Sequence, residues 1–210
     1  MKIVIFDMDG TLLDSAKDIT ISVNAVRQKN HGLSALNEAF VVEAINREHR
    51  NLAELFYETP NYEKQDQEYF EIHYDEQCIQ NVSLYDEISE VLEILRAQQV
   101  RVSVATNAPT KFARKMLEKC EVFEYFDFVI GADRVAKAKP DKEMLEYILN
   151  GYGYKPEHKA FMIGDNSKDM KAAAHAGIEG AFATWGFSPE TQHPKILSSP
   201  RDVLELLTRD

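Results

Sequence analysis

The chain has 210 residues, 44% of them hydrophobic and 28% charged, which suits one large domain or a core domain with an insertion. Its formal net charge of −11 disfavours a nucleic-acid partner, because binding to a phosphate backbone requires clustered lysines and arginines. No uninterrupted apolar stretch is long enough to span a bilayer, so we expect no membrane partner.

The first predicted strand is the apolar run at residues 3–6, which is followed directly by Asp-Met-Asp-Gly-Thr at residues 7–11. Asp7 and Asp9 are two positions apart, so they would share one face of a regular strand. Gly10 allows the chain to turn at this point. We therefore expect an acidic turn immediately after the strand.

The segment at residues 15–83 is helical by pattern and contains no convincing strand. Apolar residues recur there at three- and four-residue steps in four stretches. They predict a helix ending near Gly32 and further helices around residues 40–45, 52–56 and 69–79. We interpret this segment as a small all-helical domain inserted after the first strand.

The rest of the chain alternates between short apolar strands and amphipathic helices. Strands are predicted at residues 100–105, 128–130, 160–163 and 180–183. Helices follow them, and Pro200 opens a final one. Such alternation implies right-handed crossovers and a parallel sheet covered on both faces. The predicted fold is therefore an α/β, Rossmann-like three-layer core formed by residues 1–14 and 84–210, with the helical domain at residues 15–83.

Polar motifs follow the carboxyl ends of four of the predicted strands. They are Asp7-Met8-Asp9-Gly10-Thr11, Thr106-Asn107, Lys139-Pro140 and Gly164-Asp165-Asn166-Ser167-Lys168-Asp169. Open α/β sheets bind ligands at this edge, so we expect the four motifs to meet there. Each motif alone is more often a turn, a surface residue or a helix cap, whereas all four together favour a functional site.

These residue types suit phosphoryl transfer, which requires a nucleophile, a cation to offset oxygen charge, and a proton donor for the departing alcohol. A carboxylate can be the nucleophile and form an acyl phosphate, which water then cleaves. One or two carboxylates, such as Asp7 and Asp165, would suffice for Mg²⁺. Lys139 would supply positive charge, and Thr106 and Asn107 offer neutral donors to a substrate.

The chain closely resembles the haloacid dehalogenase-like hydrolase superfamily, and within it the phosphoglycolate phosphatase-like branch with a helical cap. Residues 6–15 match the first family motif residue for residue, and the other three motifs match at Thr106-Asn107, Lys139-Pro140 and residues 164–169. The resemblance covers the whole predicted core and, more loosely, the inserted domain, which it identifies as a cap.

The resemblance implies a role for each matching residue. Asp7 would be the nucleophile and Asp9 the general acid and base. Mg²⁺ would be held by Asp7, Asp165 and the main-chain carbonyl of Asp9, and the transferring phosphoryl group by Thr106 and Lys139. Supporting positions would be Thr11 and Asp169. Because Asp9 supplies a proton donor, a phosphate-directed reaction is favoured over dehalogenation.

Two stretches depart from the family pattern. Tyr85-Asp86 stands where many relatives have Pro-Gly at the return from the cap, which would alter the hinge and not the chemistry. Residues 47–51 stand where many relatives have a small loop that faces the active site. Our hypothesis is that Arg47 or Arg50 contacts an anionic group of the substrate, and the alternative is a solvated charged turn.

Three functions compete. The first is a Mg²⁺-dependent phosphatase, a phosphoric monoester hydrolase acting on a small phosphorylated metabolite, with phosphoglycolate as the first substrate to test by resemblance. The second is a sugar-phosphate mutase related to β-phosphoglucomutase, which would return the phosphoryl group to a sugar. The third is a signalling receiver domain, which would lack both the Asp-x-Asp-Gly-Thr opening and the helical insertion. We favour the phosphatase.

The cysteines and the amino terminus indicate a reducing compartment. Cys78 and Cys120 lie far apart without metal-ligand spacing, so we interpret them as free thiols. The first apolar run meets Asp7 too early to be the apolar stretch of a secretory signal. We expect a cytoplasmic protein, either a monomer or a homodimer.

Overall fold

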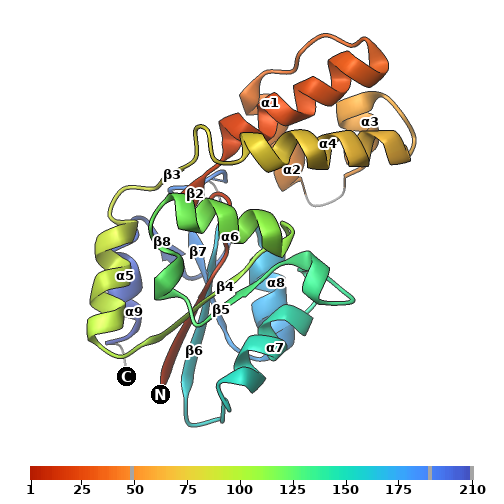
Figure 1. Ribbon diagram of the computed structural model, residues 1–210. Helices are drawn as coiled ribbons and strands as arrows, with labels where there is room; N and C mark the ends of the chain where they lie inside the picture. The colour runs from red at the N-terminus through yellow and green to blue at the C-terminus, as the bar shows by residue number, and fades with distance from the viewer. Residues whose placement is uncertain (48–49, 189–190, 209–210) are drawn as a thin grey trace. The chain divides into compact units, whose positions relative to one another are not determined.

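The computed structural model describes residues 1–47, 50–188 and 191–208. Contacts between residues divide the chain into two compact units (Figure 1). The core unit is formed by Met1–Asp14 and Leu84–Asp210, and the helical unit by Ser15–Ser83. In the described part of the chain, none of the helices has both the length and the hydropathy that crossing a membrane requires.

The core unit is built on a six-stranded sheet whose neighbouring strands run parallel. In spatial order the strands are β5 (Phe128–Ile130), β4 (Arg101–Ala105), β1 (Lys2–Phe6), β6 (Lys159–Gly164), β7 (Glu179–Ala183) and β8 (Ile196–Leu197). The predicted α/β class with a parallel sheet is confirmed. Strand β8 escapes the sequence pattern because two residues are too few to show a periodicity.

Helices cover both faces of this sheet. They are α5 (Ile88–Ala97), α6 (Thr110–Lys119), α7 (Glu143–Gly151), α8 (Ser167–Ala176) and α9 (Asp202–Leu206), with single turns of 3₁₀ helix at Phe123–Tyr125 and Ala132–Arg134. Helices α7 and α8 lie on one face, and α5 and α9 lie together on the other (Figure 1). Ile3 and Ile5 of β1 belong to the core beneath α7 and α8. Val4 and Phe6 alternate with them and are fully buried, as a strand covered on both faces requires.

Helix α8 begins directly after β6 through a capping box, which bears on the site described below. The Asn166 side chain accepts a hydrogen bond from the Lys168 N–H at 3.1 Å. In return, Oδ2 of Asp169 accepts one from the Asn166 N–H at 3.1 Å. The first turn of α8 thereby places the buried Asp169 carboxylate beside the carboxyl end of β6.

The helical unit contains the four helices predicted for residues 15–83. They are α1 (Ala16–Val26), α2 (Glu38–Asn46), α3 (Leu52–Tyr57) and α4 (Lys64–Gln77). A π-helical turn at Arg27–His31 extends α1 as far as Gly32. Two short strands, β2 (Leu13–Asp14) and β3 (Ser83–Leu84), pair with each other at the two junctions between the units.

A buried carboxylate joins the first and last helices of the helical unit. Asp18, in the first turn of α1, is fully buried. Its Oδ1 accepts hydrogen bonds from Gln77 Nε2 at 2.8 Å and from Asn81 Nδ2 at 2.7 Å. Its Oδ2 accepts one from the Asn81 main-chain N–H at 2.9 Å. Asp18 therefore accepts from the polar groups at the end of α4 and just after it.

We predict that Asp18→Ala destabilises the protein, because it leaves the donors of Gln77 and Asn81 without their acceptor. Gln77 is half-buried and Asn81 is exposed, so water can satisfy their donors, and the expected loss is that of hydrogen bonds to a charged group, about 1.5–3 kcal/mol. Urea unfolding followed by circular dichroism measures the change in the free energy of unfolding. Lys17→Ala removes the exposed neighbouring side chain on α1 and serves as the control. Equal stabilities of the two variants would contradict the prediction.

Candidate active site

The carboxyl ends of β1, β4 and β6 lie side by side in the centre of the sheet. Phe6 of β1 is in register with Val104 of β4 on one side and with Ile163 of β6 on the other. The next residues, Asp7 and Thr106, continue the ladder: the Asp7 N–H donates to the Ile163 carbonyl at 2.8 Å and the Thr106 N–H to that of Ile130 at 3.0 Å. This is the edge at which open α/β sheets bind ligands.

Three carboxylates converge at this edge. Asp7, Asp165 and Asp169 each offer an oxygen within 4.8 Å of the other two. Asp7 is half-buried, whereas Asp165 and Asp169 are each only 1% exposed. Asp7 thus meets two carboxylates that follow it by 158 and 162 positions in the sequence, and its meeting with Asp165 is the one expected from their places at the strand ends.

The buried ammonium group of Lys139 lies among these carboxylates. Its Nζ is 2.7 Å from Oδ1 of Asp7, 2.6 Å from Oδ1 of Asp169 and 2.6 Å from the Ala105 carbonyl oxygen. Burial lowers the pKa of Lys139, but the negative charges of Asp169 and Asp7 outweigh this effect and raise it well above its ordinary value. Lys139 therefore stays charged.

One ammonium group does not balance three carboxylates. Burial raises the pKa of Asp165 well above its usual range, and the charges of Asp7 and Asp169 raise it further. Burial and Asp7 also raise the pKa of Asp169, against the opposing effect of Lys139. A divalent cation would remove this excess of negative charge, and carboxylate oxygens are the ligands that Mg²⁺ prefers. The residues present therefore fit a Mg²⁺ ion.

Of the two predicted supporting residues, Thr11 lies beside the cluster and Asp169 is part of it. The Thr11 hydroxyl is fully buried and donates to Oδ1 of Asp165 at 3.1 Å. Asp169 uses its Oδ1 for Lys139 and its Oδ2 for the Asn166 N–H. Both side chains therefore orient the charged groups around them.

Thr106 and Asn107 follow β4 and reach the same edge. Thr106 is 1% exposed, and its Oγ1 accepts a hydrogen bond from the Ala108 N–H at 3.1 Å. The Asn107 side chain binds the main chain of Lys139 twice: Nδ2 donates to the carbonyl at 2.9 Å, and Oδ1 accepts from the N–H at 3.0 Å. The Asn107 amide therefore holds Lys139 in place, and the contact of Asn107 with substrate stays a prediction.

Asp9 lies in the turn after β1, where Gly10 adopts φ +80° and its N–H donates to the Leu13 carbonyl at 2.9 Å. Among the described acidic residues, Asp9 is not a member of the three-carboxylate cluster. Tyr85, at the return to the core unit, lies close enough to be affected: burial, then Asp14, Asp165 and Asp9, raise its pKa. Its phenol is therefore neutral at physiological pH.

Arg47 and Arg50 belong to the helical unit, and their contact with substrate stays a prediction. Arg47 forms an ion pair with Glu43 at 2.8 Å, with its guanidinium 6.0 Å from the centre of the Phe40 ring. Arg50 Nη1 donates to the Arg47 carbonyl at 2.9 Å. Glu48 and His49 of the same predicted loop lie outside the described residues.

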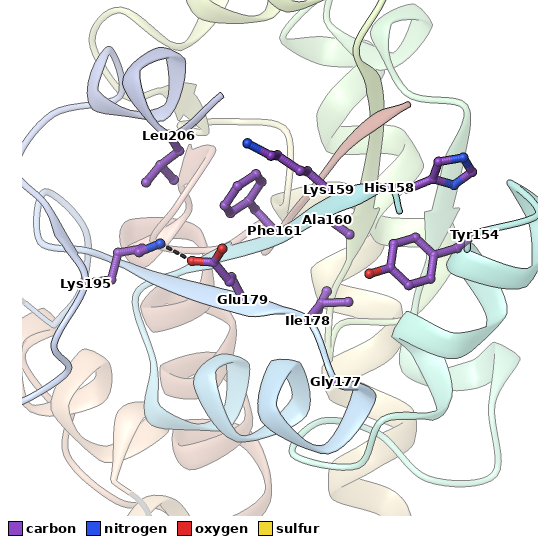
Figure 2. A pocket seen from close by; sticks show the side chains of 10 residues that line it. All are labelled: Tyr154, His158, Lys159, Ala160, Phe161, Gly177, Ile178, Glu179, Lys195 and Leu206. Carbon is purple, nitrogen blue, oxygen red and sulfur yellow. Dashed lines mark hydrogen bonds and ion pairs between the residues drawn. The ribbon is translucent and has the colours of Figure 1, made fainter. Parts of the chain in front are cut away.

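A cavity of about 270 Å³ lies at the amino ends of β6 and β7. Figure 2 shows the side chains that line it. Lys159 and Glu179, which line it, are the first residues of β6 and β7, and Glu179 forms an ion pair with Lys195 there. The cavity contains none of the residues predicted for catalysis. The acidic cluster at the carboxyl ends of the strands is therefore the candidate active site.

Sequence reasoning missed the segment after β7. This segment contacts the turn after β1 and the Asp165 side chain through Trp185, Gly186 and Phe187. A signal was present, since a glycine between two aromatic residues follows a predicted parallel strand, whose carboxyl end must lie at the same edge.

The chain is similar to known proteins over its whole length. Residues 4–183 match the family model described as haloacid dehalogenase-like hydrolase. A phosphoglycolate phosphatase of Aquifex aeolicus is 32% identical over 212 aligned positions, which cover 99% of this chain and 97% of the relative. An N-acetylmuramic acid 6-phosphate phosphatase of Pseudomonas aeruginosa is 30% identical, covering 100% of this chain and 96% of the relative. The crystal structure of a predicted phosphoglycolate phosphatase from Haemophilus somnus superposes with a TM-score of 0.85 at 25% identity, covering 99% and 98% of the two chains.

We predict that Asp165→Asn stabilises the metal-free protein at neutral pH. The folded-state pKa of Asp165 is raised above the unfolded value of about 3.9. Between these two values the folded state binds more protons than the unfolded state, so stability falls as the pH rises through this range. We expect Asp165→Asn to raise the Tm at pH 7 in EDTA by about 2–4 °C, the shift that 1 kcal/mol produces in a protein of this size.

The measurement is thermal unfolding in EDTA between pH 4 and pH 8. The advantage of Asp165→Asn should shrink toward pH 4, where the wild-type carboxyl group is protonated. Asp86→Asn changes an exposed carboxylate and is the control. A variant that unfolds below the wild type at pH 7 without metal would refute the electrostatic account.

Proposed function

The chain belongs to the haloacid dehalogenase-like hydrolases and is a phosphatase, and we propose that it hydrolyses a small phosphate monoester through a phosphorylated Asp7, with Mg²⁺ as its metal ion. The observation that supports this most directly is the cluster of Asp7, Asp165, Asp169 and Lys139 at the carboxyl ends of the central strands. The chain belongs to a family of hydrolases, which argues against the alternative of a signalling receiver domain.

Mg²⁺ would be held by Asp7, Asp165 and the main-chain carbonyl of Asp9. When bound, the ion would offset the negative charge of the phosphoryl oxygens. Lys139 would add a second positive charge on the same side, since its Nζ lies 2.7 Å from Asp7. This local positive charge would offset the repulsion between phosphate esters and a chain whose net charge is −11.

The reaction would proceed in two displacements. An Asp7 oxygen attacks phosphorus, the bond between phosphorus and the ester oxygen breaks, and the alcohol leaves with a proton from Asp9. A water molecule then attacks the acyl phosphate and gives its proton to Asp9, so that phosphate leaves and both carboxyl groups regain their initial states. Thr106 and Lys139 would hold the phosphoryl oxygens during both displacements.

The helical unit would act as the cap of the site and set substrate choice. Closure would exclude bulk water and opening would release product. Phosphoglycolate is the first candidate substrate, because the Aquifex aeolicus relative is a phosphoglycolate phosphatase. N-acetylmuramic acid 6-phosphate is the second, after the Pseudomonas aeruginosa relative. The cytoplasmic location expected from the sequence belongs to the same proposal.

A panel of phosphate monoesters, assayed with Mg²⁺ and with EDTA, tests the proposed reaction. We expect steady release of inorganic phosphate that depends on Mg²⁺. Asp7→Asn should lower the rate by about 10⁴-fold or more, the scale known for the loss of a nucleophile in other covalent catalysts. Glu157→Gln changes an exposed carboxylate of the same unit that has no proposed role, and it should keep the wild-type rate.

Two outcomes would contradict this scheme. Full activity of Asp7→Asn would exclude Asp7 as the nucleophile. An isomeric sugar phosphate formed without net release of phosphate would identify a mutase instead.

Mass spectrometry of the rapidly quenched wild-type enzyme should detect the phosphorylated Asp7.

The cap hypothesis predicts that Arg47→Ala or Arg50→Ala lowers kcat/KM for the preferred substrate. An arginine that contacts an anionic group contributes a charge-assisted hydrogen bond, and its loss costs about 10–100-fold. A substrate that lacks the second anionic group should be hydrolysed equally well by variant and wild type. Lys64→Ala removes an exposed cation of the helical unit and is the control. Unchanged kcat/KM for every substrate in both arginine variants would reject the hypothesis.

A further inference from the structure

The segment that follows β7 lies directly against the acidic cluster. The Trp185 indole N–H donates to the main-chain carbonyl of Thr11 at 2.9 Å. Two residues later, the Phe187 N–H donates to Oδ2 of Asp165 at 3.0 Å. We call residues 185–187 the aromatic loop. It binds both the turn after β1 and the carboxylate after β6, which are the two segments that would hold the metal ion.

Gly186, in the middle of the aromatic loop, allows this close approach. A methyl group at this position would overlap the main-chain carbonyl of Gly10, so no larger residue fits without displacing one backbone from the other. Its φ does not lie in the left-handed region. Glycine is therefore required here by the contact with the turn after β1 and not by its own backbone conformation.

The aromatic loop is anchored at its start. The Thr184 N–H and its hydroxyl both donate to the Leu197 carbonyl of β8, at 3.0 and 3.1 Å. On its other side, β7 pairs with β6, with Phe182 in register with Gly164. The parallel ladder and the short strand β8 thus fix where the loop leaves the sheet, next to Asp165.

The two oxygens of Asp165 have different donors. Thr11 donates to Oδ1 and the aromatic loop to Oδ2, so the plane of the carboxylate is held from two sides. Outer hydrogen bonds of this kind orient the ligands of a metal ion, and losing one costs about 10–100-fold in metal affinity.

We propose that the aromatic loop is a positioning element of the metal site, which orients Asp165 toward the ion and couples that orientation to the turn at Gly10 and Thr11. The proposal rests on the proposed function for the identity of the ion. It also makes Trp185, the only tryptophan of the chain, a spectroscopic reporter of the site. The residues of the loop act through Asp165 and are not themselves catalytic.

The test is direct metal binding to the full-length protein. Electron paramagnetic resonance of free Mn²⁺, with competition by Mg²⁺, measures the dissociation constants of both ions without substrate. Gly186→Ala should weaken binding by about 10–100-fold. Trp185→Phe keeps an aromatic ring but loses the donor to Thr11, and should weaken binding by about threefold to tenfold. Titration of the wild type with Mg²⁺ should change the Trp185 fluorescence, and Asp165→Asn should abolish the change.

A matched control separates this role from general stability. Gly153 has φ +62° and no atom near its absent side chain, so Gly153→Ala strains the backbone away from the site. It should lower the Tm in EDTA, as we also expect for Gly186→Ala, and yet keep the wild-type affinity for Mn²⁺. Weakened binding in Gly153→Ala to the same extent would overturn the positioning role.

The outcomes distinguish this proposal from the proposed function. If Gly186→Ala and Trp185→Phe both bind Mn²⁺ within twofold of the wild type while the wild type hydrolyses phosphate esters, the loop has no positioning role and the phosphatase mechanism stands. If the wild type neither binds Mn²⁺ nor requires Mg²⁺, the proposed metal chemistry is rejected, and the positioning role that depends on it is rejected as well. Should Gly186→Ala not fold, Trp185→Phe decides.

Discussion

The burial of the Lys139 ammonium group against Asp7 and Asp169 is the interaction on which the site depends. Leaving a buried charge without its partner costs about 3–5 kcal/mol, a large part of the stability of an ordinary domain. The carboxylates can therefore gather only where a cation is held among them. The chain holds this one firmly, because Asn107 binds the main chain of Lys139 twice and the Ala105 carbonyl accepts from its Nζ.

The same charge balance explains why the cluster suits a further cation. Lys139 compensates part of the charge of Asp7 and Asp169. Burial raises the pKa of Asp165, whose two oxygens accept hydrogen bonds from the neutral donors Thr11 and Phe187. A buried carboxylate without a compensating charge lowers the stability of the fold. When it is held in one orientation, however, it is well suited to bind a metal ion. Local electrostatics thus support the proposal that a metal ion assists phosphoryl transfer at this cluster.

Similarity at the level found here identifies the chemistry more closely than the substrate. Relatives with 32% and 30% identity over nearly the whole chain are named for two different substrates, a two-carbon acid phosphate and an amino-sugar phosphate. Phosphoryl transfer needs only a few groups at the strand ends, and these lie in the core unit. Selectivity would come from groups that meet the rest of the substrate, which we assign to the helical unit and to Arg47 and Arg50.

The sequence by itself determined the longer strands and helices and the edge of the sheet at which Asp7, Thr106 and Asp165 meet, because apolar periodicity is local and parallel strands end at a common edge. The two-residue strands β2, β3 and β8 are too short to show such a periodicity. Only the tertiary structure decided the contacts between those segments. In the tertiary structure the Asn107 amide forms hydrogen bonds with the main chain of Lys139. The capping box of α8 brings Asp169 into the cluster, and Gly186 lies against Gly10. The contacts of Asn107 with Lys139 and of Gly186 with Gly10 join residues far apart in the chain, and they follow from strand register, which no local pattern specifies. The capping box is local, but its place beside Asp7 depends on the same register.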